Sequence, residues 1–313
     1  MNTATLLRRA LLVPPTILVI AALPPAMAGT PLLEPIRAYL ASFSDGSFLT
    51  FVIAGIPRNY ARIAPPYVVT TFAYATISLV AGLTAGTVAA VLLARTTPRT
   101  SVRVLSFLAG IPDFVLALLL QLMAVALGRL VGGRLFRIAM GSNDGLIVLP
   151  VVALAGYVAL RVIHSGTATA GRLLNSDHVR FAAALGFPSL RVRSLHLTPG
   201  VIPVLRSELP VIIGNLVAAL CIAERLFLIP GITRILFQFG FLVDSPVAND
   251  RYQYTLVVNA LVTIFLISTV LFPLAHATLS ILQRLAVSTG RSGVSGRSGA
   301  PPRPAVGTVG RRQ

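Results

Sequence analysis

The sequence contains no lysine and few charged residues of any kind. Charged residues make up 11% of the 313 positions, whereas about a quarter is usual in soluble domains. Hydrophobic residues make up 55%, and the mean hydropathy is +0.84. A chain with so little charge cannot cover a soluble surface of this size. It is therefore predicted to be a membrane protein that crosses the bilayer several times.

All 26 basic residues are arginine, and they give the chain a net charge of +17. The arginines are spread along the ends of apolar runs and the C-terminal tail. A nucleic-acid-binding protein concentrates such charge on one soluble face, so no nucleic-acid partner is predicted. Arginines at the ends of membrane spans instead orient the chain in the bilayer.

The residues that would support catalysis are also scarce. The single cysteine, Cys221, lies in an apolar run and cannot form an internal disulfide. No G-x-x-x-x-G-K-[ST] loop is present to bind a nucleotide, so energy from ATP would have to come from a partner. The histidines lack metal-ligand spacing; they are His164, His178, His196 and His276. We therefore predict no catalytic residue, no metal site and no cofactor for this chain.

Apolar runs long enough to cross a bilayer, which takes about 20 residues, predict an all-α protein with six transmembrane helices. The predicted spans are 10–28, 67–94, 104–127, 145–163, 201–223 and 254–283. The first run follows two arginines and ends in Ala-Met-Ala, a pattern that also fits a signal peptide. We favour an uncleaved N-terminal transmembrane helix over 1–28.

The remaining segments divide the chain further. Residues 29–66 are mixed in polarity, and their apolar core, 48–56, is too short to span, so this segment is predicted to lie at the outer surface. Residues 67–287 form the main transmembrane unit, in which 224–251 is predicted to be an outer loop. The tail, 288–313, is rich in Gly, Ser, Pro and Arg and is predicted to be disordered.

The distribution of arginines predicts the orientation. With the N-terminus inside, 17 of the 26 arginines lie on the cytoplasmic side. The positive-inside rule then predicts a plasma-membrane protein with both termini on the cytoplasmic side.

The longest polar interruption between two apolar runs extends from Asp177 to Pro199. Capping residues precede a stretch with helical spacing, which Gly186 is suited to end. Pro188 is suited to the first position of a second short helix. The segment is predicted to form a rigid, L-shaped projection within the loop 170–200.

The pattern in this projection is Asp-x-Val-Arg-x-Ala-x-Ala-x-Gly from Asp177 to Gly186, with Pro199 thirteen positions after the glycine. It resembles the EAA loop of permease subunits of binding-protein-dependent ABC importers, and the dipeptide, oligopeptide and nickel branch most of all. In that family the loop is the coupling helix, which seats in a cleft of the cytoplasmic ATPase. The resemblance implies these coupling residues: Asp177, Val179, Arg180, Ala182, Ala184, Gly186, Pro188, His196 and Pro199.

A second pattern lies downstream, Ile222-x-Glu224-x-x-Phe227-x-x-Pro230-Gly231-Ile232. It resembles the family's V-E-x-x-F-x-x-P-G-[IL] segment beyond the fifth span. Together the two patterns imply a type I importer permease fold that pairs with a second permease. They also imply ATPase partners that hold ATP and Mg²⁺, and an extracytoplasmic binding protein that delivers peptides or a similar small solute.

Polar side chains inside the predicted spans are candidates for lining a solute pathway. They are Asp113, Gln121, Glu208, Asn215 and Asn259. Ionisable groups at the centre of a span are unfavourable by roughly 2.5 to 3.5 kcal/mol, so both acids need water or a partner. The alternative is that they lie near the cytoplasmic ends, where Glu208 can pair with Arg206 or reach lipid headgroups.

Two alternatives remain open at the level of function. The polar projection, with Arg180, Arg191 and Arg193, could lie on anionic lipid of the inner leaflet instead of docking an ATPase. The chain could also be a secondary transporter or channel that works without ATP. Such a protein is expected to carry coupling acids deep within its spans, or inverted repeats.

Overall fold

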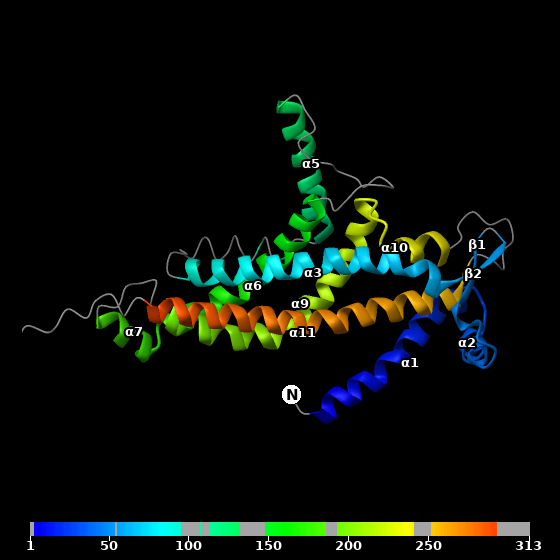
Figure 1. The fold of residues 1–313 in the computed structure, drawn as a ribbon, viewed down its shortest axis with the longest axis horizontal. Helices are drawn as coiled ribbons and strands as arrows, with labels where there is room; N and C mark the ends of the chain where they lie inside the picture. The colour runs from blue at the N-terminus through cyan, green and yellow to red at the C-terminus, as the bar shows by residue number, and fades with distance from the viewer. Residues whose placement is uncertain are drawn as a thin grey trace, which may run out of the picture.

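A computed structural model describes residues 3–53, 55–94, 107, 110, 113–131, 148–185, 193–240 and 252–292. Four long helices dominate this part of the chain (Figure 1): α3 (Tyr60–Leu93), α6 (Val148–Leu174), α9 (Thr198–Leu226) and α11 (Tyr254–Ser292). The most extensive contact joins α3 to α6; α6 also packs on α9, and α11 packs on both α9 and α3.

The four long helices correspond to four of the six predicted spans. In the described residues, four helices are long and apolar enough to cross a membrane: Tyr60–Leu93, Val148–Leu174, Leu195–Leu226 and Tyr254–Ser288. The helix of the second predicted span begins at Tyr60 and not at residue 67, because the side chain of Asn59 accepts a hydrogen bond from the N–H of Ala61 (2.9 Å) and caps it.

The other two predicted spans fall on helices with shorter apolar stretches. The first lies in α1 (Thr3–Met27), whose apolar stretch is Leu12–Met27. The third overlaps α5 (Asp113–Val131), whose apolar stretch is Phe114–Met123. Residues 104–106, 108, 109, 111 and 112 lie outside the described part. The six-span count therefore stays a prediction.

Two predicted boundaries at the C-terminal ends of helices are wrong. The fourth predicted span ends at residue 163, yet α6 continues to Leu174. The tail predicted to be disordered from residue 288 is helical at its start, because α11 continues to Ser292; residues 293–313 lie outside the described part. In both places the helix continues past its apolar stretch into more polar residues, so hydropathy marks where the apolar run ends and not where the helix ends.

The predicted helical fold class is confirmed in the described residues, and the segment 29–66 adds a small strand pair to it. This segment contains α2 (Leu33–Asp45), a 3-10 turn (Ser47–Leu49) and an antiparallel hairpin of β1 (Thr50–Ile53) and β2 (Ile56–Asn59). β-Branched and aromatic residues favour a strand in β1, and Gly55 adopts a φ of 77° beside the reversal. The side chain of Gln253 bonds both the N–H and the carbonyl of Val52, each at 2.7 Å, and so fixes the hairpin to the chain just before α11.

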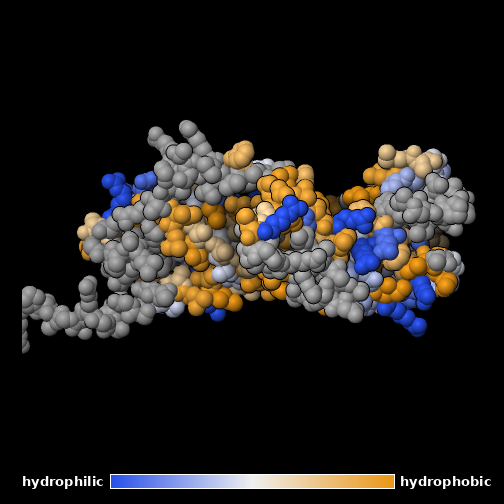
Figure 2. All heavy atoms as spheres, turned by 90° about the horizontal axis from the view of Figure 1, so that it is seen from above, coloured by the Kyte–Doolittle hydropathy of each residue, from blue (hydrophilic) through white to orange (hydrophobic). Residues whose placement is uncertain are grey.

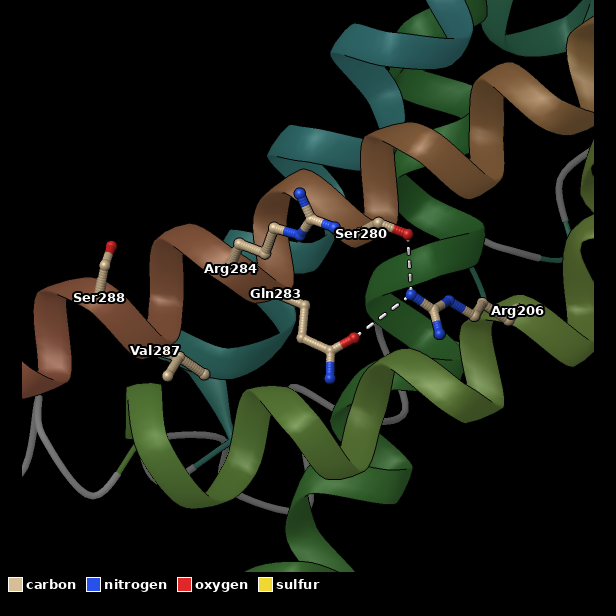
Figure 3. A pocket seen from close by; sticks show the side chains of 6 residues that line it. All are labelled: Arg206, Ser280, Gln283, Arg284, Val287 and Ser288. Carbon is tan, nitrogen blue, oxygen red and sulfur yellow. Dashed lines mark hydrogen bonds between the residues drawn. The ribbon is translucent and has the colours of Figure 1, made fainter.

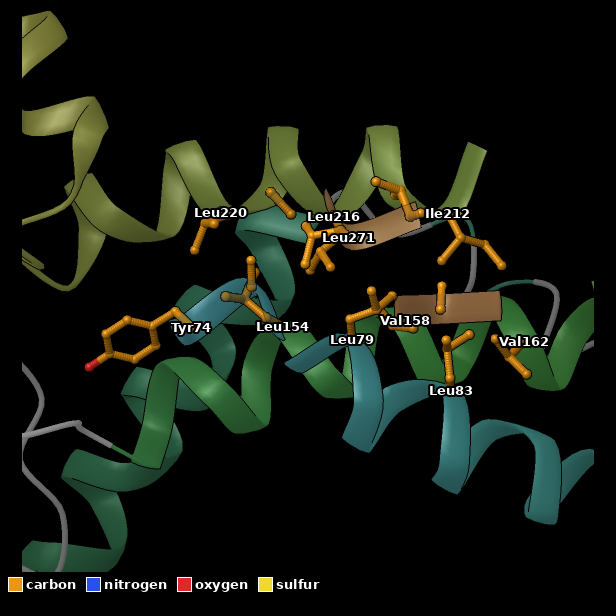
Figure 4. Close-up of a cluster of buried hydrophobic side chains, with 14 of the residues drawn as sticks. Tyr74, Leu79, Leu83, Leu154, Val158, Val162, Ile212, Leu216, Leu220 and Leu271 are labelled. Carbon is orange, nitrogen blue, oxygen red and sulfur yellow. The ribbon is translucent and has the colours of Figure 1, made fainter. Parts of the chain in front are cut away.

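The main core lies where α3, α6, α9 and α11 meet, and it consists mainly of aliphatic side chains together with the buried ring of Tyr74 (Figure 4). Its centre includes fully buried Leu79 and Leu83 from α3, Val162 from α6 and Leu216 from α9. Around this core, much of the coloured surface in Figure 2 is apolar, and hydrophilic residues appear at both ends and in patches near the middle. The large apolar share fits a body that is partly surrounded by lipid.

Two glycines explain the extensive contact between α3 and α6. A Cβ added to Gly82 would lie 2.6 Å from Cβ of Val158 and 2.7 Å from the carbonyl oxygen of Ala155. A Cβ at Gly86 would lie 2.7 Å from Cβ of Val162. The small-residue spacing on α3 therefore permits a close approach of the two helix backbones.

We predict that Gly82→Ala destabilises the bundle, because the methyl group meets the backbone of α6 and cannot be relieved by a rotamer change. Overpacking of this kind typically lowers the free energy of unfolding by about 1 to 3 kcal/mol. The matched control is Gly156→Ala on α6, where an added Cβ meets nothing within 4 Å. Thermal unfolding of the purified proteins in detergent should show a lower midpoint for the first variant only; equal midpoints would contradict the prediction.

Candidate functional site

The first part of the candidate site is α7 (Asp177–Ala184), a short helix beyond the end of α6. The carbonyl of Ser176 accepts hydrogen bonds from the N–H groups of Val179 (3.1 Å) and Arg180 (3.0 Å), which starts the helix. Val179 is 2% exposed and Ala182 4% exposed. Val179 packs in a small cluster with Val91 of α3 and Leu197, so α7 is attached to the bundle by its apolar side.

The opposite side of α7 faces away from the bundle. Arg180 and Ala184 are exposed, and Phe181 is 67% exposed. The residues implied by the resemblance therefore divide into two groups, one that anchors the helix and one that is available to a partner. Phe181 is an addition that the pattern did not single out, since the pattern leaves its position variable.

The structure places the end of the same loop beside α7. A short π-helix (Arg193–Leu197) leads directly into α9, with Pro199 in the first turn of α9. His196 is half-buried, and its ring centroid lies 6.2 Å from that of His178 on α7. Gly186 and Pro188 lie outside the described residues, so the rigid elbow between the two arms stays a prediction.

The second part of the candidate site is at the other end of α9, where Glu224 is 2% exposed. Its carboxylate accepts a hydrogen bond from the Thr71 hydroxyl of α3 (2.5 Å) and from the N–H of Thr233 (2.9 Å). Thr71 in turn accepts from the N–H of Ile232 (2.8 Å). One carboxylate thus joins α3, α9 and the start of α10 (Ile232–Ile235). We call Glu224, Thr71, Ile232 and Thr233 the Glu224 cluster.

The remaining motif residues shape the turn that closes this cluster. Phe227 is fully buried, and the N–H of Ile229 donates to the carbonyl of Glu224 (2.9 Å). A Cβ on Gly231 would lie 2.0 Å from Oε1 of Glu224, so only glycine fits beside the carboxylate. Pro230, the other residue of the motif, immediately precedes this position.

Part of the segment predicted to be an outer loop, 224–251, is helical and packs against the bundle. Residues 232–240 form α10 and a π-helical turn, Leu236–Gly240. Ile232 and Ile235 are fully buried, and this segment packs on α3 and α11. The sequence drew attention to Glu224 and Gly231. It gave no signal for Thr71, which sits in an ordinary apolar helix beside a second threonine.

Among the candidate pathway residues, Asn259 has a packing role. It is 7% exposed; its Oδ1 accepts from the Tyr39 hydroxyl (3.0 Å), and its Nδ2 donates to the carbonyl of Phe48 (2.7 Å). Burial raises the pKa of the Tyr39 phenol above its ordinary value. Asn259 therefore fastens α2 and the following turn to α11, and its expected pathway role stays a prediction.

The other four candidates are not gathered at one place. Gln121 of α5 donates to the carbonyl of Leu226 (3.4 Å), at the end of α9. Glu208 and Asn215 are half-buried on α9, and Glu208 lies about 27 Å along the helix from Leu226 at 1.5 Å per residue. Asp113 is the first residue of α5. A pathway role for these four residues stays a prediction.

Arg206 forms its hydrogen bonds with α11 and not with Glu208, the partner that the sequence suggested. Its guanidinium donates to Oγ of Ser280 (3.0 Å) and to Oε1 of Gln283 (3.3 Å), both on α11. For metals, a search of the described residues found no group of three or more His, Cys, Asp or Glu side chains that could hold an ion.

We predict that Thr71→Val destabilises the protein, because it leaves the carboxylate and the N–H of Ile232 each short of one partner. A buried polar group without a partner costs about 1 to 3 kcal/mol. Thr70→Val is the matched control, since the Thr70 hydroxyl bonds only the carbonyl of Pro66 in its own helix (2.9 Å). Limited proteolysis within 232–240 should become faster in the first variant alone; Thr71→Ser should restore protection.

The comparisons with known proteins agree with this architecture. The sequence profile of the family described as binding-protein-dependent transport system inner membrane component matches residues 82–280, which is more than half of the chain. A search of curated proteins found no match. The match includes α7, α9 and the Glu224 cluster apart from Thr71. The chain is therefore a multi-pass membrane protein and belongs to the family of binding-protein-dependent transport system inner membrane components.

Proposed function

We propose that this chain is one of the transmembrane subunits of an ATP-driven ABC importer, and that α7 docks the ATPase. Two permeases together form the pathway, and an extracytoplasmic binding protein delivers the solute. The chain itself carries out no covalent chemistry and binds no cofactor; ATP and Mg²⁺ are held by the ATPase partners. Its task is to change which side of the membrane the pathway opens to.

The observation that carries this proposal is the division of α7 into an anchored side and an exposed side. Val179 and Ala182 are buried against the bundle, whereas Arg180, Phe181 and Ala184 are exposed. A helix that only filled a loop would not need this arrangement. An aromatic side chain and an arginine next to a small residue form a surface that fits a shallow cleft of a partner protein.

The chain offers a direct mechanical connection from α7 to the transmembrane helices. Residues 148–185 are described without a gap, so α6 continues into α7 through a short turn. Val179 also packs with Leu197 at the start of α9. A displacement of α7 by the ATPase would therefore move α6 and α9 together. α9 is about 43 Å long at 1.5 Å per residue, and its other end carries the Glu224 cluster.

The proposed orientation places α7 in the cytoplasm and the hairpin of β1 and β2 outside. Figure 1 shows α7 at one end of the long helices and the hairpin at the other. Arg172 lies in the last turn of α6, Arg180 lies on α7, and Arg284 lies near the C-terminal end of α11. The positive-inside rule favours such arginines on a cytoplasmic face. The hairpin and α2 would then face the binding protein.

A surface for the second permease is proposed on α5. This helix projects from the bundle in Figure 1. Its side chains Leu118, Leu122 and Met123 are 47%, 68% and 52% exposed. An apolar helix that stands apart in a single chain is suited to pack against a second transmembrane subunit, with lipid covering whatever that subunit leaves open.

The proposed solute class is peptides or a similar small molecule. Support comes from the pattern Asp177-x-Val179-Arg180, which resembles the dipeptide, oligopeptide and nickel branch. Selection of the cargo would lie mostly in the binding protein, which fits the absence of a gathered polar site among the candidate pathway residues described above.

The competing function is transport without ATP, for which a buried acid inside a span would be the relevant feature. Glu224 is such an acid, but both its oxygens are bound within the protein, to Thr71 and Thr233. A coupling acid must exchange its proton with water during each cycle. Uptake of solute by the purified chain alone in liposomes would favour this competing function.

We predict that Ala184→Arg keeps the chain in the membrane but abolishes co-purification of the ATPase. The new side chain would occupy the exposed side of α7 and separate it from the cleft. Loss of a central interface contact is typically about 2 kcal/mol or more, so retained ATPase should fall about thirtyfold. The measurement is a pull-down of the tagged chain from its native membranes, followed by immunodetection of the bound ATPase.

The matched control is Ala61→Arg, since Ala61 is also an exposed alanine but lies near the first turn of α3, beside the hairpin. This variant should retain the ATPase at the wild-type level. Normal retention of the ATPase and normal solute uptake in Ala184→Arg would contradict the docking role.

A further inference from the structure

A cavity of about 710 Å³ lies between α9 and α11, away from the parts of the candidate site described above. Arg206 of α9 faces it, and the rest of its wall comes from the last turns of α11 (Figure 3): Ser280, Gln283, Arg284, Val287 and Ser288. The cavity is at the end of the long helices that carries α7. Among the described residues, two arginines and no acidic side chain line it, so this part of its wall is positively charged.

One buried nitrogen of Arg206 lacks a hydrogen-bond acceptor among the described residues. Two hydrogen bonds hold the guanidinium of Arg206 by its Nη2, to Ser280 and Gln283. Its Nε is buried and has no hydrogen-bond partner among the described residues. A buried N–H without a partner is unfavourable. An anion with several oxygens in the cavity could accept from the guanidinium groups of Arg206 and Arg284 together, and phosphate geometry suits arginine particularly well.

The surface beside the cavity is apolar, which distinguishes between sources of phosphate. Ile281 and Leu285 on α11 are 56% and 58% exposed. They lie one helical turn apart, next to the row of Arg284 and Ser288 on the same helix. A soluble phosphate would make no favourable contact with these apolar side chains, whereas the acyl chains of a phospholipid would cover them.

We propose that this cavity binds the phosphodiester headgroup of an anionic phospholipid from the leaflet on the α7 side. Arg206 and Arg284 bind the phosphate, and the acyl chains lie along Ile281 and Leu285. Basic pockets between transmembrane helices are suited to such headgroups. The bound lipid would join α9 to α11 at the end where α7 is attached.

The test uses the purified full-length chain in detergent, titrated with phosphatidylglycerol or phosphatidylcholine and followed by native mass spectrometry. Phosphatidylglycerol should bind at least about tenfold more tightly than phosphatidylcholine. Arg284→Gln should weaken phosphatidylglycerol binding about fivefold, the effect expected for one arginine near an anionic lipid. Arg284 is exposed, so this change should leave the thermal midpoint unaltered.

The matched control is Arg172→Gln, which removes an exposed arginine from the last turn of α6, outside the cavity. It should bind phosphatidylglycerol like the wild type. Equal loss in the two variants, or equal binding of the two lipids, would overturn the proposal, since either result assigns the effect to net charge or to acyl chains alone.

Two further arms identify the occupant. Inorganic phosphate at tens of millimolar should fail to displace the bound lipid; displacement would assign the cavity to soluble phosphate and overturn the lipid proposal. If Arg284→Gln released a co-purifying ATPase and left lipid binding unchanged, the cavity would be a protein contact and the proposal would also fail.

Discussion

The carboxylate of Glu224 imposes the strongest constraint on this fold. It is buried at the end of a long apolar helix, where an unpaired charge would be unfavourable by several kcal/mol. The Thr71 hydroxyl and the N–H of Thr233 donate hydrogen bonds to it, and these two donors come from two other elements. Because removal of either donor leaves a buried group unpaired, α3, α9 and α10 must keep their relative positions. Gly231 is part of the same constraint, since any side chain there would collide with the carboxylate.

This constraint complements the packing in the middle of the bundle. There, Gly82 and Gly86 let α3 approach α6 closely, and α6 in turn packs on α9. Close backbone contact at the centre and a polar cluster at one end make α3, α6 and α9 a stiff unit. A stiff unit is what a permease needs if a force applied at α7 is to be felt on the far side of the membrane.

Sequence reasoning predicted best where a local pattern has a local cause. Capping residues before Asp177 predicted the start of α7, and long apolar runs predicted the four long helices. It failed where the cause lies far away in the chain. The strand Thr50–Ile53 is stabilised by Gln253, about 200 residues later, and the sequence near residue 50 does not indicate that partner. The length of a helix beyond its apolar stretch was also not predictable from hydropathy.

The same distinction applies to the candidate site. The motif around Glu224 was visible, but its polar character suggested a loop at the surface. The buried arrangement depends on Thr71, 153 positions away in sequence. Asn259 was considered for the pathway because it is polar within a span, yet its partners belong to the segment around Tyr39 and Phe48. In an apolar chain, a polar residue indicates that a partner exists, and only the fold shows which partner it is.

The central claim is that α7 and the hairpin lie on opposite sides of the membrane, with α7 in the cytoplasm. It can be tested in sealed cells after the single native cysteine is removed by Cys221→Ala. Phe181→Cys on α7 and Arg58→Cys on β2 then give two chains with one exposed cysteine each. A membrane-impermeant maleimide should label the second chain in intact cells and the first only after permeabilisation. Labelling of Phe181→Cys in intact cells would contradict the account.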